Sequence, residues 1–546
     1  MKSYLSLGLI CLFVLGTALC AAGNPVIKNQ PVSFAAATDN QKYITNGDLL
    51  MFISNHGNWG RDISGVWGHD YGTYYPYPGF LDQIIAGTYT KSPYYCGGLW
   101  LAAIDSATGD TVGAVSTYSD EYTPGPMSGG TFIPDAPEFH SYLLFSDSLA
   151  VNPNQDYLDY IQYAVAQGAP YSMSGSDTLP VMMGDEMIWS IYNDANAALH
   201  THNAGQTALL GIEIKQTTFG SNIVNSLNAV FFRFRIFNNG SKVLKETQIT
   251  FWSDPDMGNR EDDFVGCDTT LELGYVYNAD DDDTQYGTAP PAIGAILLQG
   301  PMVATGNDAD TAKMWGQSYA GFSQMDMTSS MSYVNGADPA NITEVYNLMN
   351  GTTASGAPYV YDSHNLKFKY SGNPLDGTGD LDIVQTDKKF LVTTGPIDLR
   401  PGDSTELYFV ITVANGADNL DAFSNLLQNA SYLHEFYGND FQSPMDADNE
   451  FTVPQLLSLE QNFPNPFNPE TTIRFALNRS GLAELNIFNI LGELVASPIN
   501  RQMTAGPHQV IWDGRDKNGN ELASGIYFYR LKSGSITETK KMILLK

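Results

Sequence analysis

Alternation of apolar and polar residues is the pattern that most restricts how this chain can fold. In FFRFRIFNNG (231–240), Phe232, Phe234 and Ile236 alternate with arginines before an Asn-Gly turn. A period of two puts alternate side chains on opposite faces of a strand. The 51 glycines and 31 tyrosines, with only 16% charged residues, also favour strands and turns over helices. The sequence therefore predicts a mainly β protein with a β-sandwich-rich body and few helices.

Two stretches depart from this pattern and carry helical periodicity. Apolar residues recur every three or four positions over 419–437, which predicts an amphipathic helix. The apolar face predicted for this helix comprises Leu420, Phe423, Leu427 and Leu433. A second, shorter helix is predicted over 341–349.

The first residues, MKSYLSLGLICLFVLGTALCAAG, place Lys2 before a nearly unbroken apolar stretch that ends in small residues. This layout is typical of a cleavable secretory signal, which we predict over 1–22, and a membrane anchor is the alternative interpretation of the same stretch. No later apolar run has the length needed to span a bilayer, so we expect no transmembrane segment after signal cleavage. The predicted location is secreted, extracellular or at the outer cell surface.

The formal net charge of −32 is unevenly distributed along the chain. From residue 451 onward there are ten basic and eight acidic residues, whereas the part between Lys2 and residue 451 has sixteen basic and fifty-one acidic ones, or about −35. A field of this sign repels nucleic acid and anionic lipid, so no nucleic-acid partner is expected. It suits a solvated extracellular surface or the binding of cations.

A change of composition predicts a separate C-terminal module. A polar, acidic stretch predicts a linker over 441–455, behind a β-rich extracellular body over 23–440 with a further division near residue 215. In LEQNFPNPFNPETTIRFAL, three prolines predict an extended entry segment before an alternating strand. Further strands are predicted over 482–488, 508–512 and 526–531, with a last one ending at Lys546. Because short turns separate them, 456–546 is predicted to be a small antiparallel β-sandwich.

These C-terminal motifs, in this order, resemble a known domain. NFPNPFNPETTIRFAL, LNIFNILGELV and WDGRDKNGNELASGIYFYRL resemble the C-terminal (type A) sorting domain of type IX secretion cargo, and also the immunoglobulin-like domain of flagellar hook-capping proteins. The resemblance covers about 456–546. It implies an Ig-like fold, the type IX secretion machinery as a partner, and passage across the outer membrane. The body resembles uncharacterised exported proteins with such tails. This second resemblance does not indicate which activity, if any, the body has.

The densest group of chemically capable side chains lies in DPDMGNREDD (254–263) and shortly after it. Calcium prefers six to eight oxygen ligands on a flexible loop, which alternating carboxylates around a glycine can supply. The predicted calcium ligands are Asp254, Asp256, Glu261, Asp262, Asp263 and Asp268. The spacing departs from an EF-hand loop, since Gly258 occupies the fifth position and no Glu the twelfth. An acidic surface turn between two strands is the alternative interpretation.

Two other acidic segments have simpler explanations. The four aspartates of 280–283 would repel one another if packed, so we expect a mobile, solvated loop there. In the C-terminal module, Asp513 and Asp516 lie in a glycine-containing turn, where aspartates cap their own backbone and Gly514 takes a positive φ. We therefore expect a turn and not a cation site in the C-terminal module.

Three further features have two interpretations each. His200 and His202 lack a third ligand at a metal-binding spacing, so an exposed polar pair is favoured over a metal site. Cys96 and Cys267 remain after signal removal, either as one disulfide or as two buried thiols. The N-terminal aromatic residues pack in a core or, less favoured, stack on sugars, and YGTYYPYPG is expected to be an exposed loop. These aromatic residues are Trp59, Trp67, Tyr71, Tyr74, Tyr75, Tyr77, Phe80, Tyr94, Tyr95 and Trp100.

No local motif specifies an enzyme, because the GxSxG, HExxH, Walker and dinucleotide-binding patterns are all absent. We therefore hypothesise that the body is non-catalytic and serves adhesion, structure or the binding of a glycan or other surface ligand, with calcium as a stabilising ion. The alternative is an extracellular hydrolase acting on polysaccharide or protein, with carboxylates from separate strands as acid and base. A pocket with two carboxylates about 5 to 10 Å apart would favour the hydrolase.

Overall fold

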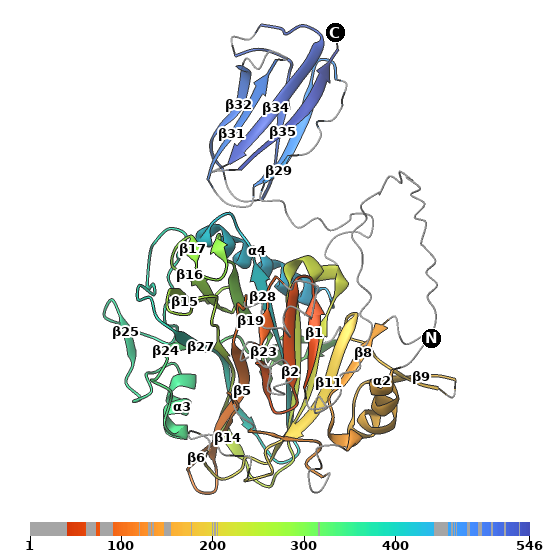
Figure 1. The fold of residues 1–546 in the computed structure, drawn as a ribbon, viewed down its shortest axis with the longest axis vertical. Coiled ribbons are helices and arrows are strands. Elements are labelled where there is room, and N and C mark those ends of the chain that lie inside the picture. Colours follow the sequence, from red (N-terminus) through yellow and green to blue (C-terminus); the bar gives the residue numbers. More distant parts are fainter. Residues whose placement is uncertain are drawn as a thin grey trace, which may run out of the picture. The chain divides into compact units, whose positions relative to one another are not determined.

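A computed structural model describes most of the body and of the C-terminal module. The described residues are 41–61, 72–76, 91–118, 121–128, 133, 136–146, 154–175, 177–198, 200, 204, 206–314, 317–441, 457–459, 462, 465, 467–477, 481–489, 494–503, 506–517, 520–533 and 536–545. The predicted signal and nearly all of the predicted linker lie outside these residues. Strands and helices carry the labels of Figure 1.

The body is built on two nine-stranded antiparallel sheets. The first sheet has the order β1-β2-β3-β5-β14-β27-β24, with β4 beside β2 and β6 beside β5. Its strands are β1 (Gln41–Asn46), β2 (Leu49–Ser54), β3 (Asn58–Gly60), β4 (Thr73–Tyr74), β5 (Cys96–Asp105), β6 (Thr111–Val115), β14 (Leu244–Asp254), β24 (Ser329–Val334) and β27 (Lys388–Leu399). The second has the order β15-β16-β19-β28-β13-β12-β11-β7, with β8 beside β11. Its strands are β7 (Thr123–Pro124), β8 (Tyr142–Phe145), β11 (Glu186–Asn193), β12 (Ile212–Gly220), β13 (Ala229–Asn238), β15 (Asp263–Asp268), β16 (Leu273–Asn278), β19 (Ala292–Gln299) and β28 (Ser404–Ala414).

The two sheets pack face to face around the largest apolar core of the described residues. On β13, the predicted alternation is confirmed, because Phe232, Phe234 and Ile236 are fully buried and the arginines between them are partly exposed. Phe251 of the first sheet stacks on Phe409 of the second, with ring centroids 4.8 Å apart. The body is therefore a β-sandwich, as predicted. Both sheets take strands from either side of residue 215, which lies within β12.

Helices cover the outer faces of the sandwich (Figure 1). Helix α3 (Ile342–Met349) packs its apolar side on Trp100, Trp252 and Leu391 of the first sheet. Helix α4 (Asn419–Gly438) packs on the second sheet. Both helices confirm their predictions, and Asn341 and Asp418 cap their N-termini by accepting backbone N–H bonds.

One residue of the predicted apolar face of α4 is placed differently. Leu420 is 37% exposed, because it lies in the first turn and off the buried side. The buried side follows a spacing of three to four residues and comprises Phe423, Leu426, Ala430, Leu433 and Phe436.

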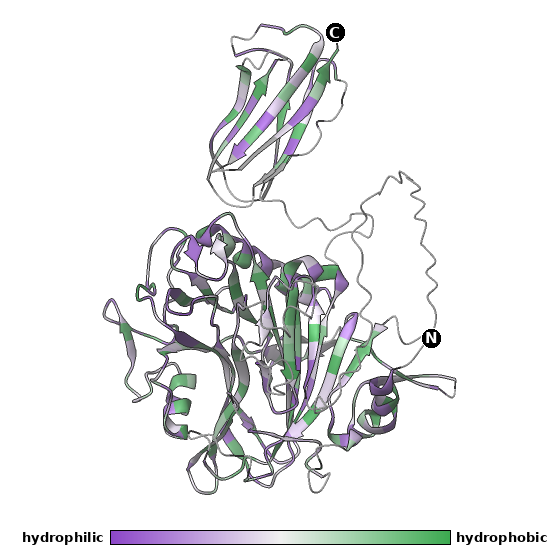
Figure 2. Cartoon of the chain, in the orientation of Figure 1, coloured by the Kyte–Doolittle hydropathy of each residue, from purple (hydrophilic) through white to green (hydrophobic). Residues whose placement is uncertain are grey.

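Short elements connect and decorate the sheets. The short helices are η1 (Pro137–Phe139), α2 (Gln155–Asp159), η3 (Tyr160–Ala164), η4 (Val165–Gln167) and η5 (Asn222–Leu227). The two-stranded hairpins pair β9 (Tyr171–Ser174) with β10 (Asp177–Pro180), β17 (Asp282–Asp283) with β18 (Gly287–Thr288), β20 (Met302–Ala304) with β23 (Phe322–Gln324), β21 (Thr311–Met314) with β22 (Gln317–Ala320), and β25 (Tyr359–Tyr361) with β26 (His364–Leu366). Figure 2 shows long apolar stretches on the strands of the sandwich, whereas the connecting loops are largely polar. Among the described residues, no helix combines the length and apolar character required to cross a bilayer.

The C-terminal module consists of two antiparallel sheets that share one core. A three-stranded sheet contains β29 (Leu457–Leu459), β30 (Thr471–Leu477) and β33 (Gly506–Trp512), and a four-stranded sheet has the order β32-β31-β34-β35. The latter strands are β31 (Gly481–Phe488), β32 (Leu494–Met503), β34 (Gly525–Ser533) and β35 (Ile536–Leu544). Ile473, Leu485, Trp512 and Tyr529 pack between the sheets. The sandwich and its predicted strands are confirmed, and β29 and β32 are additional.

Candidate functional site

Three carboxylates meet at one end of the first sheet. Asp254 is the last residue of β14, Asp256 follows two residues later, and Asp387 directly precedes β27. Because β14 and β27 are antiparallel neighbours with Ser253 opposite Phe390, the end of β14 lies beside the start of β27. Each of the three side chains offers one oxygen, and these oxygens all lie within 4.8 Å of one another.

The carboxylates of this group, called here the aspartate cluster, are incompletely hydrogen-bonded. One oxygen of Asp254 accepts a hydrogen bond from the Tyr118 hydroxyl, and Oδ2 of Asp387 accepts one from Asn335 Nδ2 at 2.8 Å. Within the described part of the chain, the Oδ1 atoms of Asp254 and Asp387 are buried without a hydrogen-bond partner, and the two residues are only 4% and 5% exposed. Buried polar atoms are usually satisfied, so these two oxygens require an explanation.

Burial and mutual repulsion both disfavour three ionised carboxylates in this place. Burial, reinforced by the charges of Asp254 and Asp387, raises the pKa of Asp256. Burial also raises the pKa values of Asp254 and Asp387, although Lys389 partly opposes the effect. Besides Lys389, a second cationic group is nearby. The Arg260 guanidinium has Nη1 3.7 Å from Asp256 Oδ2 and Nε 3.5 Å from Asp387 Oδ2, and its side chain is 54% exposed.

The other predicted calcium ligands lie outside the aspartate cluster. Glu261 is exposed and contacts Arg260. Asp262 accepts a hydrogen bond from Asn259 Nδ2 at 2.7 Å, and Asp263 accepts one from the Met257 N–H at 3.1 Å. Asp268 is at the opposite end of β15 from Asp263, about 17 Å away at roughly 3.3 Å per strand residue. The sequence analysis identified Asp254 and Asp256 but missed Asp387, whose place follows from the pairing of two strands far apart in the chain.

The acidic run of 280–283 is solvated as expected at its first three aspartates, which are exposed, but not at Asp283. Asp283 is 2% exposed and accepts hydrogen bonds from the N–H groups of Asn259, Gln285 and Tyr286, so it organises a turn. The expectation for the histidines is wrong. His200 is 5% exposed, with Nδ1 3.1 Å from Glu121 Oε1, because it lies inside the body and not on an exposed face. His202 lies outside the described residues.

The aromatic and sulfur-containing residues also have a clear place. Five of the N-terminal aromatic residues are almost fully buried, which agrees with packing in a core and not with stacking on sugars. They are Trp59, Tyr74, Tyr75, Tyr94 and Trp100. The described part of YGTYYPYPG, residues 72–76, contains β4, which pairs with β2, contrary to the expected exposed loop, because Tyr74 and Tyr75 are buried. Cys96 and Cys267 are both buried free thiols.

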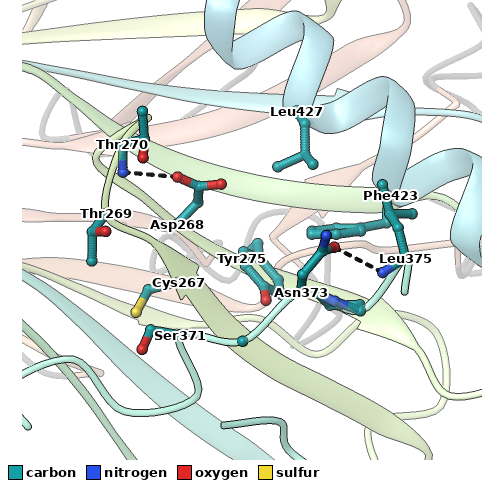
Figure 3. A pocket seen from close by; sticks show the side chains of 12 residues that line it. Cys267, Asp268, Thr269, Thr270, Tyr275, Ser371, Asn373, Leu375, Phe423 and Leu427 are labelled. Atoms are coloured by element: carbon teal, nitrogen blue, oxygen red, sulfur yellow. Dashed lines mark hydrogen bonds between the residues drawn. The ribbon is translucent and has the colours of Figure 1, made fainter. Parts of the chain in front are cut away.

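A pocket of about 250 Å³ opens beside the other end of β15 (Figure 3). Phe423 and Leu427, one helical turn apart on α4, provide an apolar wall, and Tyr275 comes from β16. The opposite side is a loop that includes Asn373, which bonds the Leu375 N–H at 3.0 Å. The pocket is lined by Cys267, Asp268, Thr269, Thr270, Tyr275, Ser371, Gly372, Asn373, Pro374, Leu375, Phe423 and Leu427.

Hydrogen bonds fix the orientation of the Asp268 carboxylate in this pocket. Asp268 Oδ1 accepts the N–H groups of Thr270 and Leu271 at 2.8 and 3.0 Å, while its second oxygen has no hydrogen-bond partner in the described part of the chain. Burial raises the pKa of Cys267 to about 12, so this thiol is protonated at neutral pH and is a poor nucleophile. The pocket therefore offers hydrogen-bonding groups next to an apolar wall and lacks an activated thiol.

Comparison with protein families decides the nature of the C-terminal module. Residues 461–545 match the model of the secretion system C-terminal sorting domain. The module is a type IX sorting domain. It directs export by type IX secretion to the cell surface or the outside, and it implies interaction with that machinery. The match covers none of the body, and no curated protein matches the chain in sequence.

Comparison with solved structures gives low similarity over parts of the chain. FlgD from P. aeruginosa is 22% identical, with 16% of this chain and 65% of that chain covered and a TM-score of 0.12. A polysaccharide lyase is 10% identical over 72% of this chain and 42% of its own, with a TM-score of 0.20. Dimeric latent PorU from Porphyromonas gingivalis is 11% identical, with 92% of this chain and 32% of PorU covered and a TM-score of 0.15. The chain thus spans 65% of FlgD and less than half of the other two, and TM-scores this low do not establish a shared fold.

Proposed function

We propose that the body is a non-catalytic binding module, exported by type IX secretion, whose pocket beside Asp268 takes a small polyhydroxylated ligand such as one sugar unit of a glycan. The observation that carries this proposal is the combination of a fixed carboxylate, a tyrosine hydroxyl and threonine hydroxyls with the apolar wall of α4. Sugars present hydroxyl groups on their edges and C–H groups on their faces. The polar groups of the pocket suit the hydroxyl groups, and the apolar wall suits the C–H groups.

The size of the pocket supports a small ligand. Pockets for drug-sized molecules measure roughly 300 to 1,000 Å³, and this one measures about 250 Å³. Tyr275 is a neutral donor and acceptor at physiological pH, since the ordinary pKa of a tyrosine hydroxyl is already about 10 and burial raises it further. The free oxygen of Asp268 supplies a charge-assisted acceptor, which is stronger than a neutral one.

The composition of the pocket favours binding over hydrolysis. Glycosidases use two carboxylates about 5 to 9.5 Å apart, whereas Asp268 is the one carboxylate among the lining residues. The aspartate cluster lies elsewhere in the body, and one oxygen from each of its three carboxylates lies within 4.8 Å of the others. The extracellular hydrolase is therefore the second candidate, and a hydrolysis panel on polysaccharides and proteins tests it.

Binding is tested with the purified chain on a glycan array, followed by calorimetry with the monosaccharides of the positive glycans. Leu427→Trp fills the pocket, and Asp268→Asn removes the charge while keeping an oxygen for the turn. Both are expected to weaken binding at least tenfold. Asp110→Asn, at an exposed turn, is the matched control and is expected to bind as the parent does. No glycan bound by the parent, or equal binding by Leu427→Trp, would overturn the proposal.

Export is tested independently of the ligand. Deletion of 456–546 is expected to leave the body in the periplasm, because the sorting domain spans 461–545. Surface labelling and cell fractionation measure the outcome. Unchanged surface display of the truncated chain would contradict the role of this domain in sorting.

A further inference from the structure

The aspartate cluster combines negative charge, burial and unpartnered oxygens in one place. Strand pairing between β14 and β27 brings Asp254, Asp256 and Asp387 together, although the sequence separates the third from the first two. Oδ1 of Asp254 and Oδ1 of Asp387 are buried and have no hydrogen-bond partner among the residues that the structure describes. A buried carboxylate oxygen without a partner loses the hydration it has in the unfolded chain, which is strongly unfavourable unless a cation replaces the water.

The neighbouring basic side chains do not satisfy these oxygens. Lys389 is 1% exposed, but its Nζ donates to Asn335 Oδ1 at 2.8 Å and lies over the rings of Tyr118 and Tyr333. Arg260 approaches only at 3.5 to 3.7 Å and is about half exposed. Arg260 is thus held at the rim of the cluster, and Lys389 is turned toward other acceptors. The centre of the cluster is therefore left to another cation.

We propose that Asp254, Asp256 and Asp387 bind a divalent cation, preferentially calcium, which fastens the loop after β14 to the start of β27. The donor set consists of carboxylates alone, which suits hard cations and not zinc or copper, whose sites use histidine or cysteine. Calcium is favoured over magnesium because it accepts irregular oxygen geometries and completes its shell with water or carbonyl groups. The ion is structural, since it joins two strand ends.

Direct binding is measured with terbium, a luminescent substitute for calcium. Asp254 contacts the Tyr118 hydroxyl, and the Tyr118 ring lies 5.4 Å from that of Trp252, so excitation of these aromatic groups is expected to sensitise bound terbium. Calcium is expected to displace the signal, and Asp387→Asn to reduce it at least tenfold. Asp282→Asn, in the exposed acidic turn, is the matched control for diffuse binding to an acidic surface.

Stability provides a second readout on the full chain. After treatment with chelator, calcium is expected to raise the Tm by several degrees, and Asp387→Asn or Asp256→Asn to abolish that rise. If Asp387→Asn does not fold, Asp256→Asn decides, because its side chain is 20% exposed and tolerates the change. A parent chain with no response to calcium, magnesium or manganese at 10 mM would overturn the proposal, as would an equal loss of terbium signal in Asp282→Asn.

Discussion

The acidic turn after β14 and the acidic turn between β33 and β34 are alike in sequence and different in structure. In the C-terminal domain, Asp513 is 52% exposed and accepts the Arg515 N–H, while Asp516 accepts the Asn520 N–H at 2.8 Å. In the described part of the body, Asp254 and Asp387 are buried and each keeps one oxygen without a partner. Both turns combine aspartates with glycine, so composition alone does not separate them.

The difference lies in what the rest of the fold brings to each turn. The turn of the C-terminal domain is complete by itself, since its own backbone N–H groups satisfy its carboxylates. The turn of the body is completed by a strand from a distant part of the chain, because Asp387 at the start of β27 adds a third carboxylate. Among the described residues, burial of acidic groups is thus the property that distinguishes the body from its sorting domain, and three predictions test how much it matters.

The largest expected effect is at Glu186, which faces Thr45 of β1. Burial raises the pKa of Glu186 to about 8, despite two hydrogen bonds from Thr45 that oppose the shift. The folded state therefore holds a proton that the unfolded chain releases near pH 4.5. The contribution of Glu186 to the free energy of unfolding is complete below that pH and is lost as the pH rises toward 8. At about 1.4 kcal/mol per pKa unit, the loss is on the order of 4 to 5 kcal/mol.

Glu186→Gln removes this dependence, because an amide has the shape of the neutral acid and does not ionise. Urea unfolding between pH 5 and pH 9 is expected to give a flatter profile for Glu186→Gln and a more stable protein at pH 9. Glu435→Gln, at an exposed site on α4, is the control and is expected to retain the slope of the parent. A parent profile without any decrease from pH 5 to pH 8 would contradict the assignment.

The second effect concerns the buried ion pair of Lys388 and Asp382. Lys388 Nζ lies 2.8 Å from Asp382 Oδ2, and the two side chains are 3% and 1% exposed. Asp382→Ala is expected to destabilise the body by about 3 to 5 kcal/mol, because it leaves an uncompensated buried ammonium group. Asp382→Leu combined with Lys388→Met is expected to recover most of that loss in urea unfolding. A double variant as unstable as the single one would show that packing, and not charge, controls the site.

Local patterns in the sequence predicted much of the fold. The alternation of β13, the capped helices α3 and α4, and most strands of the C-terminal domain depend on neighbouring residues, and all are confirmed. Strand β32 was missed because it contains Pro498, which is tolerated there since β32 is at the edge of its sheet. The Ig-like character of this domain stays a prediction.

The candidate sites were harder to predict, because their parts are distant in the chain. Asp387 belongs to the aspartate cluster only through the register of β14 and β27, which no spacing along the chain reveals. The pocket combines Asp268 of β15, a loop around Asn373 and Phe423 of α4. The burial of His200 against Glu121 likewise depends on segments that meet only in three dimensions.

The smallest effect is expected in the turn of the sorting domain. Asp513→Ala removes an acceptor for the Arg515 N–H and an exposed contact with the Arg515 side chain at 3.5 Å. Exposed ion pairs and turn caps of this kind contribute about 1 kcal/mol or less, and the described residues of the turn offer calcium no buried oxygen to satisfy. Hydrogen exchange over 506–533 is therefore expected to change slightly in Asp513→Ala, and equally with calcium or chelator. Protection of this turn by calcium in the parent, lost in Asp513→Ala, would place a cation in the sorting domain and remove the contrast with the body.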